Sequence, residues 1–328
     1  MSSEGIELAV SLYSFTQRFV DRDAYHVEDM FRTLRQLGVR QFEIVGAQVF
    51  DQYPRPRASE VDRVLAAAAA HGCVPFSYGG YIDSGRVSGH TPTDEDVILD
   101  LTADLMTARD LGCRYLRAGH IPEHLLEPAA QLAENYDISI GIEVHAPSRP
   151  SDEDIQRLLS RYEDIGSARL GFVPDFGCFI ERPAQPAIQR LLAMGARQDL
   201  LDYVIANRHS GVSELQMWDD VRARGGGNAE RAAIAEFFGF LSFGPADLDG
   251  FRTLLPWSLY FHSKFYHVGE DLTDQQIPLG KLLTDIVASG FEGVLMSEYE
   301  GHAFHLDDAE EQVARHLQLE RRILSSIV

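Results

Sequence analysis

Short apolar stretches alternate along the whole chain with stretches whose apolar residues recur at helical spacing. The apolar stretches predict strands, at 6–14, 41–46, 74–79, 114–119, 139–145, 170–175, 258–264 and 293–299. The others predict helices, at 26–37, 58–71, 93–111, 123–135, 152–164, 185–208, 279–289 and after 307. Strands that alternate with helices predict a parallel sheet covered by helices.

One junction recurs between these elements. A helical stretch ends in glycine, an apolar residue follows, and a strand begins a few positions later, at Gly38, Gly72, Gly112 and Gly290. Glycine suits this position because it adopts the left-handed backbone that closes a helix at little cost. Four copies of one junction indicate a repeated strand and helix unit.

Eight such units favour an α/β fold of the closed (β/α)8 type, the TIM barrel, over an open doubly wound sheet, which stays the alternative. We expect one domain over residues 1–328, since α/β barrels exceed the usual domain length. The gap from 176 to 257 is too long for one crossover. We therefore predict an insertion between the sixth and seventh strands, at 209–256, that serves as a lid or a partner-docking segment.

Composition narrows the class of protein. The formal net charge of -21 makes nucleic acid a poor partner, because the surface repels phosphates. Cys73, Cys113 and Cys178 are scattered and odd in number, which fits reduced thiols in a cytoplasm. No apolar run approaches the roughly 18 residues of a membrane span, and the N-terminus lacks a basic leader. A cytoplasmic protein without membrane contact is expected.

Polar residues collect at the ends of the last four predicted strands. In SIGIEVHAP (139–147), alternation places Glu143 and His145 on one face and isoleucine and valine on the other. The next three strands end in Asp175, His262 and Glu298. Alone, each would be an ordinary solvated, capping or structural residue. Together at the C-terminal mouth of a barrel, where active sites of this fold lie, they predict ligands of a divalent cation.

Ligand chemistry suggests the ion. Three oxygen ligands and one nitrogen, without thiolate, favour Mn²⁺, with Mg²⁺ and Co²⁺ as alternatives. Such a cation would bind a substrate carbonyl and a neighbouring hydroxyl, which acidifies the adjacent C–H bond. A shift of one pleat in the eighth strand would exchange Glu298 for Glu300 as the ligand.

Three further residues are predicted to be catalytic. His145 lies one pleat beyond Glu143 and is assigned the general base, because a neutral imidazole accepts protons near neutral pH. Alternatively it only orients Glu143 or caps the next helix. Lys264 and Glu300 stand two positions after His262 and Glu298, and they would stabilise oxyanion charge and orient ligands, or form an ion pair at the rim.

Other residues near strand ends are candidate substrate contacts. Aromatic rings that could stack on a sugar or its aglycone are those of Tyr13, Phe15, Trp257 and Tyr260, although such rings are more often core. Arg117 and His120 follow the fourth strand and could reach substrate oxygens. Glu43 in QFEIVG has inward parity and could hydrogen-bond inside the barrel.

The sequence resembles the xylose-isomerase-like barrels of sugar isomerases, epimerases and related lyases, whose Glu, Asp, His, Glu metal set matches Glu143, Asp175, His262 and Glu298. The segments that most resemble the α subunit of bacterial C-glycoside deglycosidases are SLYSF, EIVGAQVFDQYP, IEVHAPS, FHSKFY and SEYEGH. That resemblance implies a 3-oxo-C-glycoside substrate whose C3 carbonyl is held by the metal. His145 would then remove the C2 proton, and the aglycone would leave by elimination across C1 and C2. It also implies a small β subunit, with 237–251 as the candidate contact, and leaves a higher oligomer open.

Three alternatives remain at this point. The first is a free-standing keto-sugar epimerase or isomerase with the same metal set and a metal-bound glutamate as the base. The second is the abasic-site nuclease branch of these barrels, but Asp175 is followed three residues later by Cys178 where that branch has histidine. The third is a barrel that binds a sugar or a partner without turnover.

Overall fold

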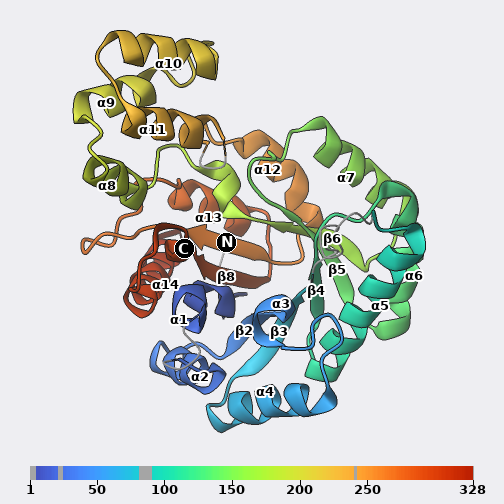
Figure 1. Ribbon diagram of the computed structural model, residues 1–328. Coiled ribbons are helices and arrows are strands. Elements are labelled where there is room, and N and C mark those ends of the chain that lie inside the picture. Colours follow the sequence, from blue (N-terminus) through green and yellow to red (C-terminus); the bar gives the residue numbers. More distant parts are fainter. Residues whose placement is uncertain (1–4, 21–24, 81–90, 240–241, 328) are drawn as a thin grey trace.

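The computed structural model describes residues 5–20, 25–80, 91–239 and 242–327 and contains one eight-stranded parallel sheet (Figure 1). The strands are β1 (Ile6–Ser11), β2 (Gln41–Val45), β3 (Val74–Gly79), β4 (Tyr115–Ala118), β5 (Ser139–Val144), β6 (Leu170–Pro174), β7 (Phe261–Phe265) and β8 (Gly293–Tyr299). Their order in the sheet is β6-β5-β4-β3-β2-β1-β8-β7. All eight predicted strands are present.

The sheet closes into a barrel between β6 and β7, the two strands at the ends of this order. β6 and β7 meet through two isolated parallel bridges, Phe172 with Ser258 and Asp175 with His262. The amide of Leu259 also donates to the carbonyl of Phe172 at 2.9 Å. The predicted (β/α)8 barrel is therefore confirmed, and the open sheet is excluded.

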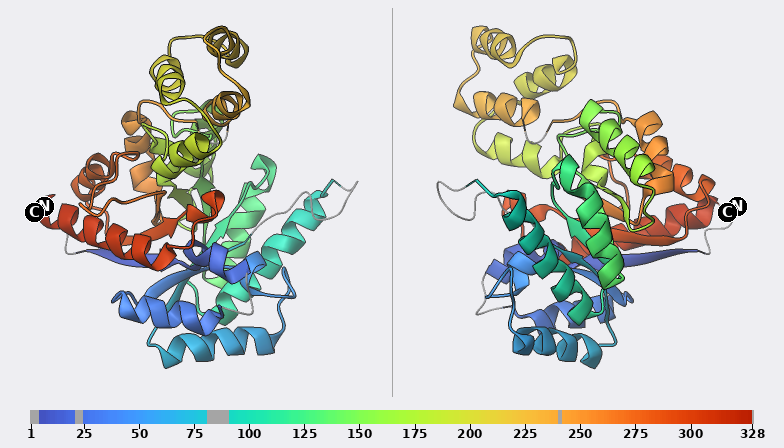
Figure 2. Two further views of the ribbon diagram at one scale, coloured as in Figure 1. Left: turned by 60° about the vertical axis from the view of Figure 1, so that its left-hand side comes forward. Right: turned by 90° about the vertical axis from the view of Figure 1, so that its right-hand side faces the viewer.

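Helices surround the barrel (Figures 1 and 2). The longer ones are α2 (Val27–Gln36), α4 (Ala58–Ala70), α5 (Asp94–Leu111), α6 (Leu126–Tyr136), α7 (Glu153–Ile165), α13 (Leu279–Ala288) and α14 (Ala309–Ile327). Short helical turns are α1 (Thr16–Val20), α3 (Gly46–Val49), η1 (Leu12–Phe15), η2 (Glu123–Leu125), η3 (Phe176–Phe179), η4 (Leu255–Trp257) and η5 (Gly301–Phe304). The four predicted helix-closing glycines all have φ between 69° and 77°, which confirms the junction.

Among the described residues, five α-helices lie between β6 and β7: α8 (Gln185–Ala193), α9 (Gln198–Asn207), α10 (Glu214–Ala223), α11 (Asn228–Phe238) and α12 (Leu248–Leu254). The single helix predicted over 185–208 is wrong, because Gly195 adopts φ 93° and separates α8 from α9. Helices α9 to α11 stand out from the barrel (Figures 1 and 2). The predicted insertion and contact segment include residues 240–241, which lie outside the described residues.

Alternation along the strands divides the side chains into two environments. Outward residues such as Ile140 and Ile142 pack under the helices in the main hydrophobic core. Inside the barrel, a small apolar cluster consists of Ala9, Phe76, Val173, Tyr260, Val294 and Met296. Among the described residues, none of the helices combines the length and hydrophobicity needed to cross a bilayer.

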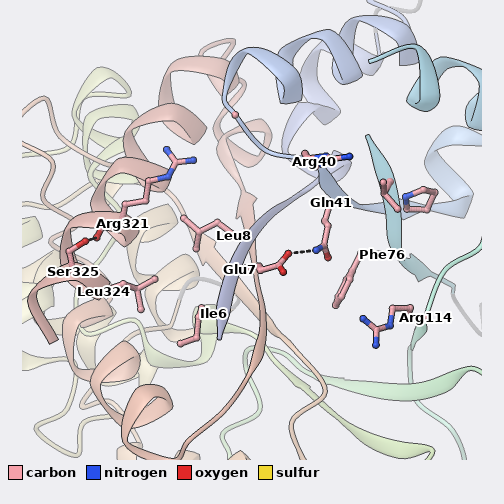
Figure 3. Close-up of a pocket in the computed structure, with 13 residues that line it drawn as sticks. Ile6, Glu7, Leu8, Arg40, Gln41, Phe76, Arg114, Arg321, Leu324 and Ser325 are labelled. Carbon is pink, nitrogen blue, oxygen red and sulfur yellow. Dashed lines mark hydrogen bonds between the residues drawn. The ribbon is translucent and has the colours of Figure 1, made fainter. Parts of the chain in front are cut away.

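A groove of about 680 Å³ lies at the N-terminal end of the strands, lined by residues of β1, β2, β3 and α14 (Figure 3). Glu7 accepts a hydrogen bond from Gln41 there. Two of its arginines are engaged at helix ends, since Arg40 donates to the Gly72 carbonyl after α4 and Arg321 to the Leu37 carbonyl after α2. Because active sites of this fold lie at the opposite end, this groove reads as part of the stabilising face.

Candidate metal centre

Four polar side chains from consecutive strands converge at the C-terminal end of the barrel. Glu143 comes from β5, Asp175 follows β6, His262 comes from β7 and Glu298 from β8, and one ligand atom of each lies within 4.8 Å of the others. His262 Nδ1 is 2.9 Å from Glu143 Oε1, 3.5 Å from Glu298 Oε2 and 3.9 Å from Asp175 Oδ2. The structure thus brings the four predicted ligands together, and we call them the four-ligand group.

The chemistry of this group suits a divalent cation. In the neutral form of His262, Nε2 donates to the Glu43 carboxylate 3.1 Å away, and Nδ1 then faces the carboxylates with a lone pair. Among the described residues, His262 Nδ1 and Asp175 Oδ2 have no hydrogen-bond partner. Lys264 Nζ forms an ion pair with Asp175 Oδ2 at 3.2 Å, but a lone pair on the buried His262 Nδ1 beside three carboxylates is unfavourable unless a cation lies between them.

The titration behaviour of the group supports the same conclusion. Burial lowers the pKa of His262, but Glu43 and Glu298 outweigh it and hold that pKa well above the usual value. Burial likewise opposes ionisation of Glu298, while His262 and Lys264 keep its pKa low. A proton on His262 therefore supplies positive charge that a metal ion would otherwise provide, and the two would compete.

Asp175 is oriented by its own turn. Its Oδ1 accepts from the Gly177 amide at 2.6 Å, at the start of η3, which leaves Oδ2 directed at the four-ligand group. A Cβ on residue 177 would lie 2.7 Å from that Oδ1, so glycine permits the close approach. Burial raises the pKa of Asp175 above its ordinary value.

The three predicted catalytic residues form a second cluster beside the group. Lys264 is 3% exposed, and its Nζ lies 2.8 Å from His145 Nε2, 2.9 Å from Glu300 Oε2 and 3.2 Å from Asp175 Oδ2. His145 Nδ1 is 2.6 Å from the Ala146 carbonyl, to which it must donate. Its Nε2 therefore carries the lone pair and accepts from Lys264.

The predicted substrate contacts fall into different environments. Tyr13 lies at the second cluster, since its hydroxyl donates to Glu300 Oε1 at 3.3 Å, whereas His120 is exposed after β4. Arg117 is buried and donates to Glu43 and Glu143.

The other three predicted aromatic contacts pack in or against the apolar cores, and the Tyr260 ring lies 5.7 Å from that of His262. Phe15 is fully buried in the main core, because η1 turns it away from the barrel interior. Tyr260 is fully buried inside the barrel, below the group, and Trp257 packs 6.0 Å from Tyr162.

Some neighbours of the group were not among the predicted contacts. His302 lies in η5 with Nε2 3.4 Å from Glu300 Oε1, and its ring meets that of Tyr13 edge-on at 4.8 Å. Ser11 and Ser77 donate to Glu43 inside the barrel. The signal of these two serines in the sequence was weak, because it consisted only of a small polar residue at an inward strand position.

Comparison with known proteins identifies relatives over the whole chain, although no family model matches. A 3'-dehydrocarminate deglycosidase alpha subunit from Microbacterium sp is 30% identical over 98% of this chain and 96% of its own length. A C-glycoside deglycosidase alpha subunit from Arthrobacter globiformis is 28% identical over 93% of this chain and 87% of its own length.

Solved structures share the fold at low sequence identity. A xylose isomerase domain protein from Planctomyces limnophilus matches 98% of this chain and 97% of its own with a TM-score of 0.54 and 12% identity. An L-ribulose 3-epimerase matches 98% of this chain and 95% of its own with a TM-score of 0.57 and 12% identity. From its sequence relatives over nearly its full length, the chain belongs to the family of C-glycoside deglycosidase alpha subunits.

Proposed function

We propose that this chain is the catalytic subunit of a metal-dependent carbon–carbon lyase that acts on 3-oxo-C-glycosides. The observation that carries the proposal is the position of His145 and Lys264, a base and a cation, directly beside the four-ligand group. The names of the relatives supply the substrate class. The proposed reaction needs a polarised carbonyl and a base within reach of the neighbouring carbon, and this arrangement supports both roles.

Glu143, Asp175, His262 and Glu298 would hold the ion, and Mn²⁺ is the expected metal because the donors are three carboxylates and one imidazole. A bound divalent cation would polarise the C3 carbonyl and so acidify the C2–H bond. The carboxylates would hold the cation in a buried site, where its electrostatic effect on a substrate is larger than in water.

His145 is proposed as the base. Its Nδ1–H is fixed by the Ala146 carbonyl, so Nε2 is the atom that takes the C2 proton. Lys264 donates to this lone pair at 2.8 Å, and a bound sugar would replace that contact. Lys264 would then donate to developing oxyanion charge, held in place by Glu300 at 2.9 Å.

The proposed reaction is an elimination across C1 and C2. The C2–H electron pair forms the C1–C2 double bond, the C1–aglycone bond breaks, and the aglycone carbon takes the bonding pair and then a proton. Hydrolysis by two carboxylates is unsuited to this bond, because a C-glycoside has no leaving oxygen to protonate. His145 can return the proton it removed.

The relatives are named alpha subunits, which implies a partner subunit, and we propose that it is a small β subunit. The insertion 209–256 is the proposed lid or docking segment. Leu215 on α10 is 69% exposed, so the insertion offers apolar surface. The insertion packs on α8, where the Arg190 guanidinium pairs with Glu236 of α11 at 2.6 Å and lies 5.5 Å from the Phe304 ring of η5, after β8.

Product analysis tests the proposal. The chain, with and without its β subunit, is incubated with a 3-oxo-C-glucoside and, separately, with a free ketose. Release of aglycone that is lost in Glu143→Gln and His145→Asn supports the lyase, and the matched control His124→Asn changes a histidine on the exposed turn η2. Epimerised ketose without aglycone release would instead establish the epimerase.

A further inference from the structure

We infer that Glu43, a buried carboxylate inside the barrel, is a positioning residue that presents two of the four metal ligands in the geometry needed to bind the ion. The inference rests on the proposed metal site and goes beyond it, since Glu43 would be no ligand itself. It acts on His262 directly and on Glu143 through Arg117.

Five side chains donate hydrogen bonds to the Glu43 carboxylate. It is 0% exposed on β2, next to a register shift between β2 and β3. The hydroxyl of Tyr260 donates at 2.7 Å and that of Ser77 at 3.0 Å, and Ser11, Arg117 and His262 also donate. Five donor groups on two oxygens leave no place for a proton on the carboxyl, so it accepts only.

The first consequence concerns His262. A neutral imidazole carries one N–H, and the other nitrogen is the metal-binding atom. Because Glu43 takes Nε2–H at 3.1 Å, Nδ1 is the lone-pair nitrogen, and it points at the four-ligand group. A carboxylate behind a ligating histidine fixes its tautomer, orients its ring and raises its basicity.

The second consequence concerns Glu143. Arg117 directs Nη2 at Glu43 Oε1 at 3.1 Å and Nη1 at Glu143 Oε2 at 2.7 Å, so one guanidinium joins the two carboxylates. With Oε2 held, Glu143 Oε1 is left facing His262 Nδ1. Gly79 makes room for this bridge, because a Cβ there would lie 2.8 Å from Arg117 Nη2.

A purely structural polar network would stabilise the fold without affecting the ion. Measuring metal binding by variants with matched burial distinguishes a role in stability from a role in positioning the ligands. Glu43→Gln is nearly isosteric, but its amide NH₂ would face groups that are themselves hydrogen-bond donors. Glu320→Gln is the control, because Glu320 is also 0% exposed but lies on α14 beside His316, away from the four-ligand group. Arg117→Lys keeps the charge beside Glu43 but cannot bridge two carboxylates.

The experiment measures Mn²⁺ affinity by calorimetry and the EPR spectrum of the bound ion at one fixed pH, with circular dichroism to verify folding. We expect a 10- to 100-fold weaker affinity and an altered spectrum for Glu43→Gln and Arg117→Lys, and wild-type values for Glu320→Gln. Folded Glu43→Gln or, should that variant not fold, folded Arg117→Lys with wild-type affinity and spectrum would overturn the inference.

The same measurement separates failure of the inference from failure of the proposed function. Wild-type protein that binds Mn²⁺ stoichiometrically and loses it in Glu143→Gln establishes the ion, whatever Glu43→Gln does. Wild-type protein that binds no divalent cation removes the metal site, and the inference about Glu43 with it.

Discussion

The buried carboxyl of Glu320 predicts that the protein becomes less stable as the pH rises. Glu320 lies on α14 and is 0% exposed, and burial raises its pKa to about 8. Its neighbour His316, with Nδ1 3.8 Å from Glu320 Oε2, cannot supply a charge, because burial lowers its pKa to about 3. At neutral pH the folded chain therefore holds a protonated acid beside a neutral imidazole.

The magnitude follows from proton linkage. In the unfolded chain this carboxyl titrates near its ordinary pKa of about 4.3. Below that value both states hold the proton and there is no penalty. Between it and about 8, unfolding releases a proton that the folded state retains, which lowers the free energy of unfolding by about 1.4 kcal/mol per pH unit. The full effect is at most about 5 kcal/mol and is reached as the pH passes about 8.

Glu320→Gln removes this titration. Urea unfolding at pH 5.0, 6.5 and 8.0, with a chelator present, should show the free energy of unfolding of the variant rising relative to that of wild type as the pH rises. The control Glu311→Gln makes the same change on the same helix at a side chain that is 64% exposed, and its difference from wild type should stay flat. A difference between wild type and Glu320→Gln that does not depend on pH would refute the reasoning.

Three further predictions concern the ion, a turn and a buried hydroxyl. Chelation should lower the melting temperature and added Mn²⁺ restore it, while Glu143→Gln responds to neither; a wild-type protein indifferent to both would argue against an ion in the four-ligand group. Gly112→Ala should cost about 1 kcal/mol in urea unfolding, since φ is 77° and no atom lies within 4 Å of the added Cβ; an unchanged midpoint would contradict this. Tyr162→Phe should leave stability unchanged or raise it by about 1 kcal/mol, because its buried hydroxyl has no hydrogen-bond partner among the described residues; a clear loss would reveal a partner, such as a bound water.

The sequence predicted the strands well because alternation and helix-closing glycines are local signals. It failed over 185–208, where apolar residues continue in helical spacing across the turn and hide the break at Gly195. Tyr260 was predicted to contact the substrate from the seventh strand, but a pattern of period two does not give height along the barrel axis. The structure puts its ring in the apolar cluster and its hydroxyl on Glu43.

The same limit applies to Arg117. The sequence places it at the end of the fourth strand, where a substrate contact is a reasonable expectation. Its partners Glu43 and Glu143 lie 74 and 26 residues away along the chain, and only the closure of the barrel brings all three together. Long-range charge pairing of this kind leaves no mark in a single sequence.

The join between β6 and β7 is the thinnest part of the barrel wall, because two isolated bridges replace a continuous ladder there. One of these bridges pairs Asp175 with His262, so an ion held by both side chains would also hold β7 against the end of β6. Release of the ion should then let the backbone at this join open locally, and its amide protons should exchange faster with solvent. The metal ion proposed for catalysis would in that way also keep the barrel closed.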